Sequence, residues 1–203
     1  GTTEWDKESD AYKIMIKDID AVSKVFLRLQ EDGVACIWRP LHEASGAWFW
    51  WGIGTAEQYK ALYKLMYDRM VKDNGVNNCL WVWNIERLNK APYDENVLEA
   101  SWYPGDEYCD FISVDVYKKA NDNGSLSGYF NKIQDLMGSD KMIALSENGP
   151  IPDVNNMHKD GAVWSWWMPW YDSWGDDKFI SQTSNSVWKS NMEDERVITL
   201  EDM

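Results

Sequence analysis

The sequence contains few of the residues on which several common kinds of functional site depend. Its 203 residues include only two histidines and three cysteines. Cys36, Cys79 and Cys109 lack the spacing of metal ligands or of a disulfide framework, and we expect Cys36 and Cys79, which lie in apolar runs, to be buried thiols. His158 lies among Asn and Lys, where we expect it to be exposed. A histidine-rich metal site is therefore excluded, whereas a cation held by carboxylates alone stays open.

Other features that the sequence lacks exclude several classes of binding partner and of enzyme. The chain carries 20 Lys and Arg against 34 Asp and Glu, a net charge of -14, and it lacks the basic face that nucleic-acid binders use. An anionic polymer would be repelled as well, so the charge favours a neutral ligand. No apolar run is long enough to span a membrane, residues 1–4 are not a signal peptide, and no Gly-x-Ser-x-Gly nucleophile elbow is present.

Tryptophan, by contrast, is abundant. The chain has 14 tryptophans, and an indole is costly to bury whole because its N–H needs a partner. The densest aromatic stretch, residues 38–52, also contains Arg39 and the dipeptide His42-Glu43. Its consecutive rings at residues 48–51 are too many for one face of a helix or strand. We therefore expect some of them to point into a cleft or at solvent, which is typical of a binding surface.

Strands and helices are predicted to alternate along one domain, residues 1–203. Apolar residues recur at helical spacing over 12–29, 59–70 and 126–137, a capping box precedes the second of these, and shorter helices are expected after Asp153, near 187–192 and over 97–102. Buried strands are predicted at 34–38, 79–83, 111–116, 142–145 and 162–167. This alternation indicates βαβ units with a parallel sheet, whose ligand site lies at the carboxyl ends of the strands. A doubly wound open sheet is the alternative, but the Gly-rich phosphate turn expected after its first strand is missing.

Two glutamates follow predicted strands directly, Glu43 and Glu147. A pair of carboxylates at the rim of an aromatic cleft is what glycoside hydrolysis requires, because one protonates the leaving oxygen while the other attacks the anomeric carbon or activates water. Indole rings suit such a substrate, since the C–H face of a sugar packs on them. His42, Asp115 and Tyr117 are candidates to orient the carboxylates. A single glutamate after a strand is more often a solvated loop residue, and it is the pair with its neighbours that favours catalysis.

Two segments resemble a known family closely. Residues 39–43, Arg-Pro-Leu-His-Glu, followed by 46–52, Gly-Ala-Trp-Phe-Trp-Trp-Gly, are similar to glycoside hydrolase family 26, the endo-β-mannanases. Residues 145–149, Leu-Ser-Glu-Asn-Gly, resemble the nucleophile strand of that family, and 110–117 and 186–203 resemble further parts of it.

The resemblance assigns roles to individual residues. It implies that Glu43 is the acid/base and Glu147 the nucleophile of a retaining mechanism, and that Tyr117 hydrogen-bonds the nucleophile, with Asp115 just before it. The resemblance and the motifs that carry it give a set of candidate substrate-binding residues. These are Arg39, His42, Trp48, Tyr117, Asp115, Trp164 and Trp166. Of the two final tryptophans, Trp166 is favoured as the platform under the sugar that precedes the cleaved bond.

The family fold is an eight-stranded (β/α) barrel, of which the first three βα units are expected to be absent from this chain. The resemblance implies an endo-acting retaining β-1,4-mannanase that needs no metal or organic cofactor, acts on neutral β-mannan outside the cytoplasm, and is a monomer when complete. A β-glucanase or xylanase of the same family is the alternative activity. A carbohydrate-binding remnant without turnover is the alternative from another class.

Overall fold

The computed structural model describes residues 3–138, 141–170 and 181–202. Its helices are α1 (Asp10–Glu31), α2 (Ala56–Tyr67), α3 (Ser127–Met137), α4 (Val154–Asp160) and α5 (Asn185–Met192). Its strands are β1 (Cys36–Trp38), β2 (Cys79–Ile85), β3 (Phe111–Val116), β4 (Met142–Asn148) and β5 (Trp167–Pro169), which follow one another in the sheet in the order β1-β2-β3-β4-β5. The α/β class with five parallel strands is thus confirmed.

The described residues cluster into two compact units. The first consists of residues 1–91 and 99–112 and the second of residues 92–98 and 113–203. No helix in the described part of the chain is both long and apolar enough to cross a membrane.

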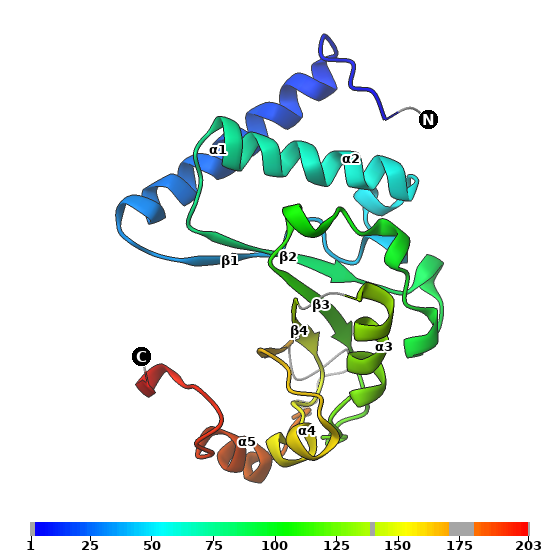
Figure 1. The fold of residues 1–203 in the computed structure, drawn as a ribbon, viewed down its shortest axis with the longest axis vertical. Helices are drawn as coiled ribbons and strands as arrows, with labels where there is room; N and C mark the ends of the chain where they lie inside the picture. Colours follow the sequence, from blue (N-terminus) through cyan, green and yellow to red (C-terminus); the bar gives the residue numbers. More distant parts are fainter. Residues whose placement is uncertain (1–2, 139–140, 171–180, 203) are drawn as a thin grey trace. The chain divides into compact units, whose positions relative to one another are not determined.

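The first unit is built on β1 and β2, which pair in parallel with Cys36 opposite Cys79. Helix α1 begins at Ser9, whose hydroxyl accepts from Tyr12 N–H, and its chain reverses at Gly33, where φ is 73°. Both α1 and α2 appear above β1 and β2 in Figure 1.

Helix α2 begins with the predicted capping box, in which the Thr55 hydroxyl accepts from Gln58 N–H and the Gln58 side chain accepts from Thr55 N–H. It continues into one π-helical segment, Asp68–Asp73. The buried side chains Tyr59, Leu62, Tyr63 and Met70 form its inner face, as the spacing predicts.

The prediction of a fully buried first strand is wrong. Regular pairing is confined to Cys36–Trp38, and Ile37 is 56% exposed. Cys36 and Cys79 are only half-buried because they pair at the start of their strands, beside exposed Ile37 and Leu80. Burial nevertheless raises the pKa of the Cys79 thiol to about 11, with Cys36 contributing.

The second unit contains α3, α4 and α5 together with β4 and β5. Tyr129, Phe130 and Ile133 form the buried face of α3. Helix α4 is capped by Asp153 as expected, and the buried side chain of Asn191 on α5 donates to Pro152 O at 2.7 Å and accepts from Val154 N–H. His158 is exposed on α4, as predicted.

The last strand is also shorter than predicted, and it lies later in the chain. Residues 162–167 were expected to form it, but regular pairing with β4 covers Trp167–Pro169. Just before β5, Ser165 N–H donates to Ile143 O and Leu145 N–H donates to Trp166 O. The register between β4 and this segment shifts between Leu145 and Asn148. An edge strand tolerates Pro169, because the missing N–H would have faced away from the ladder. The segment 97–102, expected to be a helix, instead forms parts of two 3-10 turns, Glu95–Val97 and Ala100–Trp102.

Candidate active site

Glu43 lies in a constrained loop that follows β1. Its φ is 52°, and Leu41 and Ala47 also have positive φ, at 52° and 60°. Residues with a Cβ rarely adopt this conformation, and each instance costs roughly 1–3 kcal/mol unless the surroundings impose it. Three such residues within seven positions show that tertiary contacts, rather than local preference, set the shape of this loop.

The end of β2 supplies those contacts. Asn84, a buried side chain of β2, accepts the Glu43 backbone N–H through Oδ1 at 2.7 Å. The Ser45 hydroxyl donates to Glu86 O at 2.9 Å. The loop after β1 is therefore held at two points by the polar groups where the neighbouring strand ends.

The carboxylate of Glu43 is held by the indole of Trp48. Trp48 Nε1–H donates to Glu43 Oε2 at 2.7 Å, and Glu43 is 9% exposed. The six-membered ring of Trp48 lies against Gly46, where a Cβ would come within 2.1 Å of Cη2. Gly52 is equally restricted, because a Cβ there would lie 2.0 Å from Ala44 O. The two glycines of the aromatic motif thus permit the packing that brings the indole to the carboxylate.

His42 and the other rings of the motif form a cluster beside Glu43. The His42 ring contacts Phe49 at a centroid distance of 4.8 Å, and Phe49 stacks on Trp51 at 4.5 Å. Trp51 Nε1–H donates to His42 O at 2.8 Å, which fixes the backbone next to Glu43. Trp50 is 66% exposed, so the expectation that part of this aromatic run points at solvent is confirmed.

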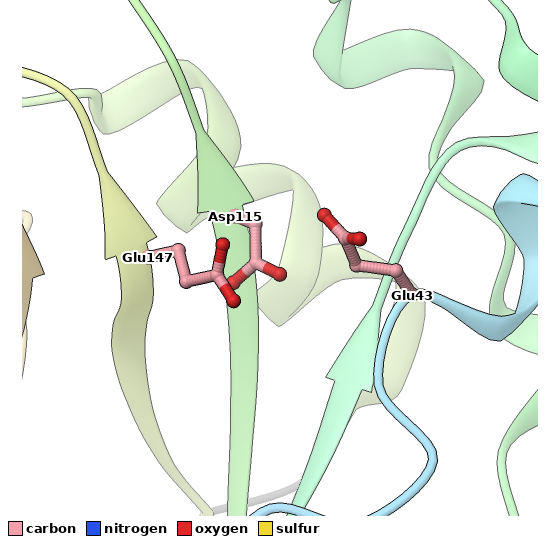
Figure 2. A group of neighbouring side chains, drawn as sticks. All are labelled: Glu43, Asp115 and Glu147. Carbon is pink, nitrogen blue, oxygen red and sulfur yellow. The ribbon is translucent and has the colours of Figure 1, made fainter. Parts of the chain in front are cut away.

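Glu147 lies within β4 rather than after it, and it is 6% exposed. The Tyr117 hydroxyl donates to Glu147 Oε2 at 2.5 Å. Asp115, buried on β3, has a carboxylate oxygen within 4.8 Å of a carboxylate oxygen of Glu147, and Figure 2 shows both side chains on their strands.

A buried hydroxyl pair supports Asp115. Ser146 Oγ donates to Asp115 Oδ1 at 2.6 Å and lies 2.7 Å from Ser113 Oγ. Ser113 and Asp115 alternate along β3, which places them on one face of the strand, and Tyr117 directly follows its last residue.

The remaining predicted residues differ in their surroundings. Arg39 directly follows β1 and is half-buried. Trp164 is 3% exposed, its Nε1–H donates to Ser125 O at 2.8 Å, and its ring packs edge-on against Phe130. These contacts place Trp164 in the core of the second unit. Trp166 is half-buried just before β5.

Sequence reasoning missed several residues that shape the two carboxylate environments. Asn84, Arg87, Ser113 and Ser146 were not singled out, although each lies on β2, β3 or β4 or just after one of these strands. Arg87 lies over the Trp48 ring, with its Cζ 4.9 Å from the ring centroid. A polar residue inside a predicted buried strand is the signal that could have found Ser113, whereas Ser146 directly follows the predicted strand 142–145.

Comparison with known proteins identifies relatives over nearly the whole chain. Residues 5–201 match the profile of glycosyl hydrolase family 26. A mannan endo-1,4-beta-mannosidase of Thermothelomyces thermophilus is 40% identical over 181 residues, which cover 88% of this chain and 33% of the relative.

Two solved structures share the fold. The Podospora anserina GH26-CBM35 β-(1,4)-mannanase has a TM-score of 0.81 at 34% identity, covering 97% of this chain and 40% of that one. The β-mannanase from a symbiotic protist of the termite Reticulitermes speratus, complexed with gluco-manno-oligosaccharide, has the same TM-score and identity, with 97% and 56% covered. The chain therefore spans a third to just over half of the length of these relatives.

Proposed function

The chain belongs to glycosyl hydrolase family 26, and from that premise we propose that it carries both catalytic carboxylates of a retaining endo-β-1,4-mannanase. The observation that carries this proposal is the environment of Glu147. It is a buried carboxylate on a strand that accepts a phenol O–H at 2.5 Å. Such a hydrogen bond fixes the orientation of the carboxylate, which a nucleophile aimed at one carbon atom requires.

In the first step of the proposed mechanism, Glu147 attacks the anomeric carbon of a mannosyl unit. The glycosidic C–O bond breaks as Glu43 gives its proton to the leaving oxygen, and a covalent glycosyl-enzyme forms. The transition state resembles an oxocarbenium ion, so the negative charge at Glu147 and Asp115 stabilises it.

In the second step, Glu43, now a carboxylate, takes a proton from water as the water oxygen attacks the same carbon. The bond to Glu147 breaks, the carboxylate is regenerated, and the product keeps its β-configuration. This mechanism requires the two carboxyl groups to be about 5–5.5 Å apart, whereas an inverting enzyme needs roughly 6.5–9.5 Å.

We assign the other residues by their chemistry. Trp166 is the proposed platform for the sugar before the cleaved bond, while Arg39 and His42 supply polar contacts to substrate hydroxyl groups. The packing of Trp164 gives it a structural role, so it is left out of this set. The substrate is a neutral polymer that does not enter cells intact, and we propose that the protein acts outside the cytoplasm.

Hydrolysis of four polysaccharides compared side by side tests the activity. We expect reducing-sugar release from galactomannan and glucomannan, with a rapid fall in viscosity that marks endo-cleavage. Faster release of reducing sugar from mixed-linkage β-glucan or from xylan would indicate that the enzyme is a β-glucanase or a xylanase instead of a mannanase. Binding to mannan without any release would instead indicate a carbohydrate-binding role.

A further inference from the structure

We propose that Arg87 is a positioning residue for Glu43 and that it acts through the indole of Trp48. This inference rests on the proposed function, in which Glu43 is the acid/base. Because it is proposed to act through another residue, Arg87 is a positioning residue and not a catalytic one.

The guanidinium of Arg87 is held in place from one side by Glu86. Its Nη1 lies 2.8 Å from Glu86 Oε1, and the same oxygen accepts the Arg87 backbone N–H at 2.7 Å. The side chains of Arg87 and Glu86 are 13% and 2% exposed. A charge this deeply buried is costly unless it is paired, so the ion pair fixes the guanidinium where it lies.

The fixed guanidinium lies over the ring of Trp48. The distance of 4.9 Å from Cζ to the ring centroid is within the range of a cation–π interaction, which is roughly 6 Å. The ring also lies against the backbone at Gly46, where no side chain could fit. Arg87 and Gly46 together define the plane of the indole and hence the direction in which Nε1–H points.

That direction matters because the indole N–H reaches Glu43 Oε2 at 2.7 Å. An indole nitrogen can only donate, so Oε2 remains an acceptor whether Glu43 is ionised or protonated. The transferable proton is then carried by Oε1, the other oxygen. A cation on the π face also draws electron density from the ring, which makes the N–H a stronger donor. Arg87 thus helps to determine which oxygen of Glu43 delivers the proton. It also strengthens the hydrogen bond that holds the Glu43 carboxyl group.

The kinetic consequence depends on the leaving group. Cleavage of a glycosidic bond in a polysaccharide needs the proton from Glu43, because the leaving group is a sugar hydroxyl. Dinitrophenolate, in contrast, leaves a dinitrophenyl glycoside without being protonated. In a protein extended to the length of the solved relatives, we expect Arg87→Met to lower kcat/KM for mannan oligosaccharides about tenfold, a part of the roughly 10²–10⁴-fold that acid–base catalysis supplies. We expect the glycosylation rate with dinitrophenyl β-mannobioside to change less than about threefold.

Further variants distinguish a loss of positioning from damage to the fold. Trp48→Phe keeps a ring but removes the N–H donor, so it should show the same dependence on leaving group. If Arg87 acts through Trp48, adding Arg87→Met to Trp48→Phe should cost little more, because effects along one chain of contacts are not additive. Arg196→Gln removes an arginine from a surface pair with Asp194 and serves as the matched control. If Arg87→Met fails to fold, Glu86→Gln/Arg87→Met removes the buried partner as well.

A spectroscopic measurement tests the same contact without turnover. The indole N–H resonance of Trp48, identified by its loss in Trp48→Phe, should lie downfield and move upfield in both Arg87→Met and Glu43→Gln. An unmoved resonance in Arg87→Met, equal losses with both leaving groups, or additive effects in the double variant would overturn the proposal. A wild-type protein that hydrolyses neither substrate would contradict the proposed function instead, and the resonance would still decide whether Arg87 governs the hydrogen bond.

Discussion

Glu43 and Glu147 each accept a hydrogen bond from an aromatic side chain, but the two donors suit different tasks. In the proposed mechanism, the phenol of Tyr117 orients the carboxylate that attacks. The indole of Trp48 engages one oxygen of Glu43 and cannot accept a proton from it. In the proposed mechanism, Glu43 alternates between acid and base while the indole keeps its orientation.

The two carboxylates should respond differently to removal. Glu147→Ala should abolish turnover of every substrate, by at least about 10⁴-fold, because no covalent intermediate can form. Glu43→Ala should spare the first step for a dinitrophenyl glycoside, and the intermediate should then accumulate because its hydrolysis lacks a base. Burst kinetics measured on that substrate distinguish the two variants. Equal losses for both variants on activated and natural substrates would show that the roles are wrongly assigned.

Much of this pair was predictable from the sequence, because each glutamate stands beside a recognisable strand and an unusual aromatic or polar neighbour. The supporting residues were not. Arg87 contacts the ring of Trp48, which lies in a distant segment of the chain. A local sequence pattern cannot predict a contact of this kind. Trp164, in contrast, was singled out from the sequence as a substrate-binding residue because it alternates with Trp166 along a predicted strand. In the structure its indole N–H donates to Ser125 O in the core.

At the scale of elements, the helices were predicted more accurately than the strands at the ends of the strand order. Helical spacing extends over many residues, so α2 and α3 are determined by several apolar positions and by the Thr55 cap. β1 and β5 each have only three residues. Their bounds depend on pairing with a neighbouring strand, which a local sequence pattern does not specify.

Helix α1 is attached to the π-helical segment that continues α2 by an ion pair whose effect should depend on pH. Asp20 Oδ1 and Oδ2 each lie 2.8 Å from a guanidinium nitrogen of Arg69, and Asn74 Nδ2 also donates to Oδ1. Arg69 and Asn74 hold the pKa of Asp20 below its usual value of 3.8. Because the folded pKa is lowered, the stabilisation is present above the unfolded pKa and is lost as pH falls through the folded value.

Asp20→Asn should therefore destabilise the protein at pH 7 by about 1 kcal/mol, the scale of a partly exposed pair. The difference between wild type and variant should shrink below about pH 4, the unfolded pKa of an aspartate. Chemical denaturation at pH 7 and at pH 3 measures both values. Asp18→Asn, on the exposed side of the same helix, is the matched control. A difference that persists unchanged at pH 3 would rule out the charge of Asp20 as its source.

At the scale of the whole molecule, β1 and β5 stand at the two ends of the strand order. β1 carries an exposed isoleucine at its centre, and α1 exposes Ile14 and Val25. Open edges and apolar surface of this kind favour association unless another segment covers them. The solved relatives extend well beyond the part that this chain matches.

We predict that a polypeptide of these 203 residues alone melts broadly, associates in solution and has little activity. A version extended to the length of the solved relatives should show a cooperative melt and mannanase activity together. Calorimetry, light scattering and reducing-sugar assays on the two versions make the comparison. A sharp two-state melt with full activity from the 203 residues alone would refute the prediction.

The central claim, that Glu147 is the nucleophile of a retaining glycosidase, is tested most directly by trapping its intermediate. A 2-deoxy-2-fluoro-β-mannoside with an activated leaving group slows both steps, because fluorine destabilises the oxocarbenium-like transition state, and the covalent adduct then accumulates. Peptide mass spectrometry after digestion should locate one mannosyl adduct on Glu147, and Glu147→Ala should carry none. An adduct on another residue, or an active enzyme that releases α-configured product without any adduct, would contradict this account.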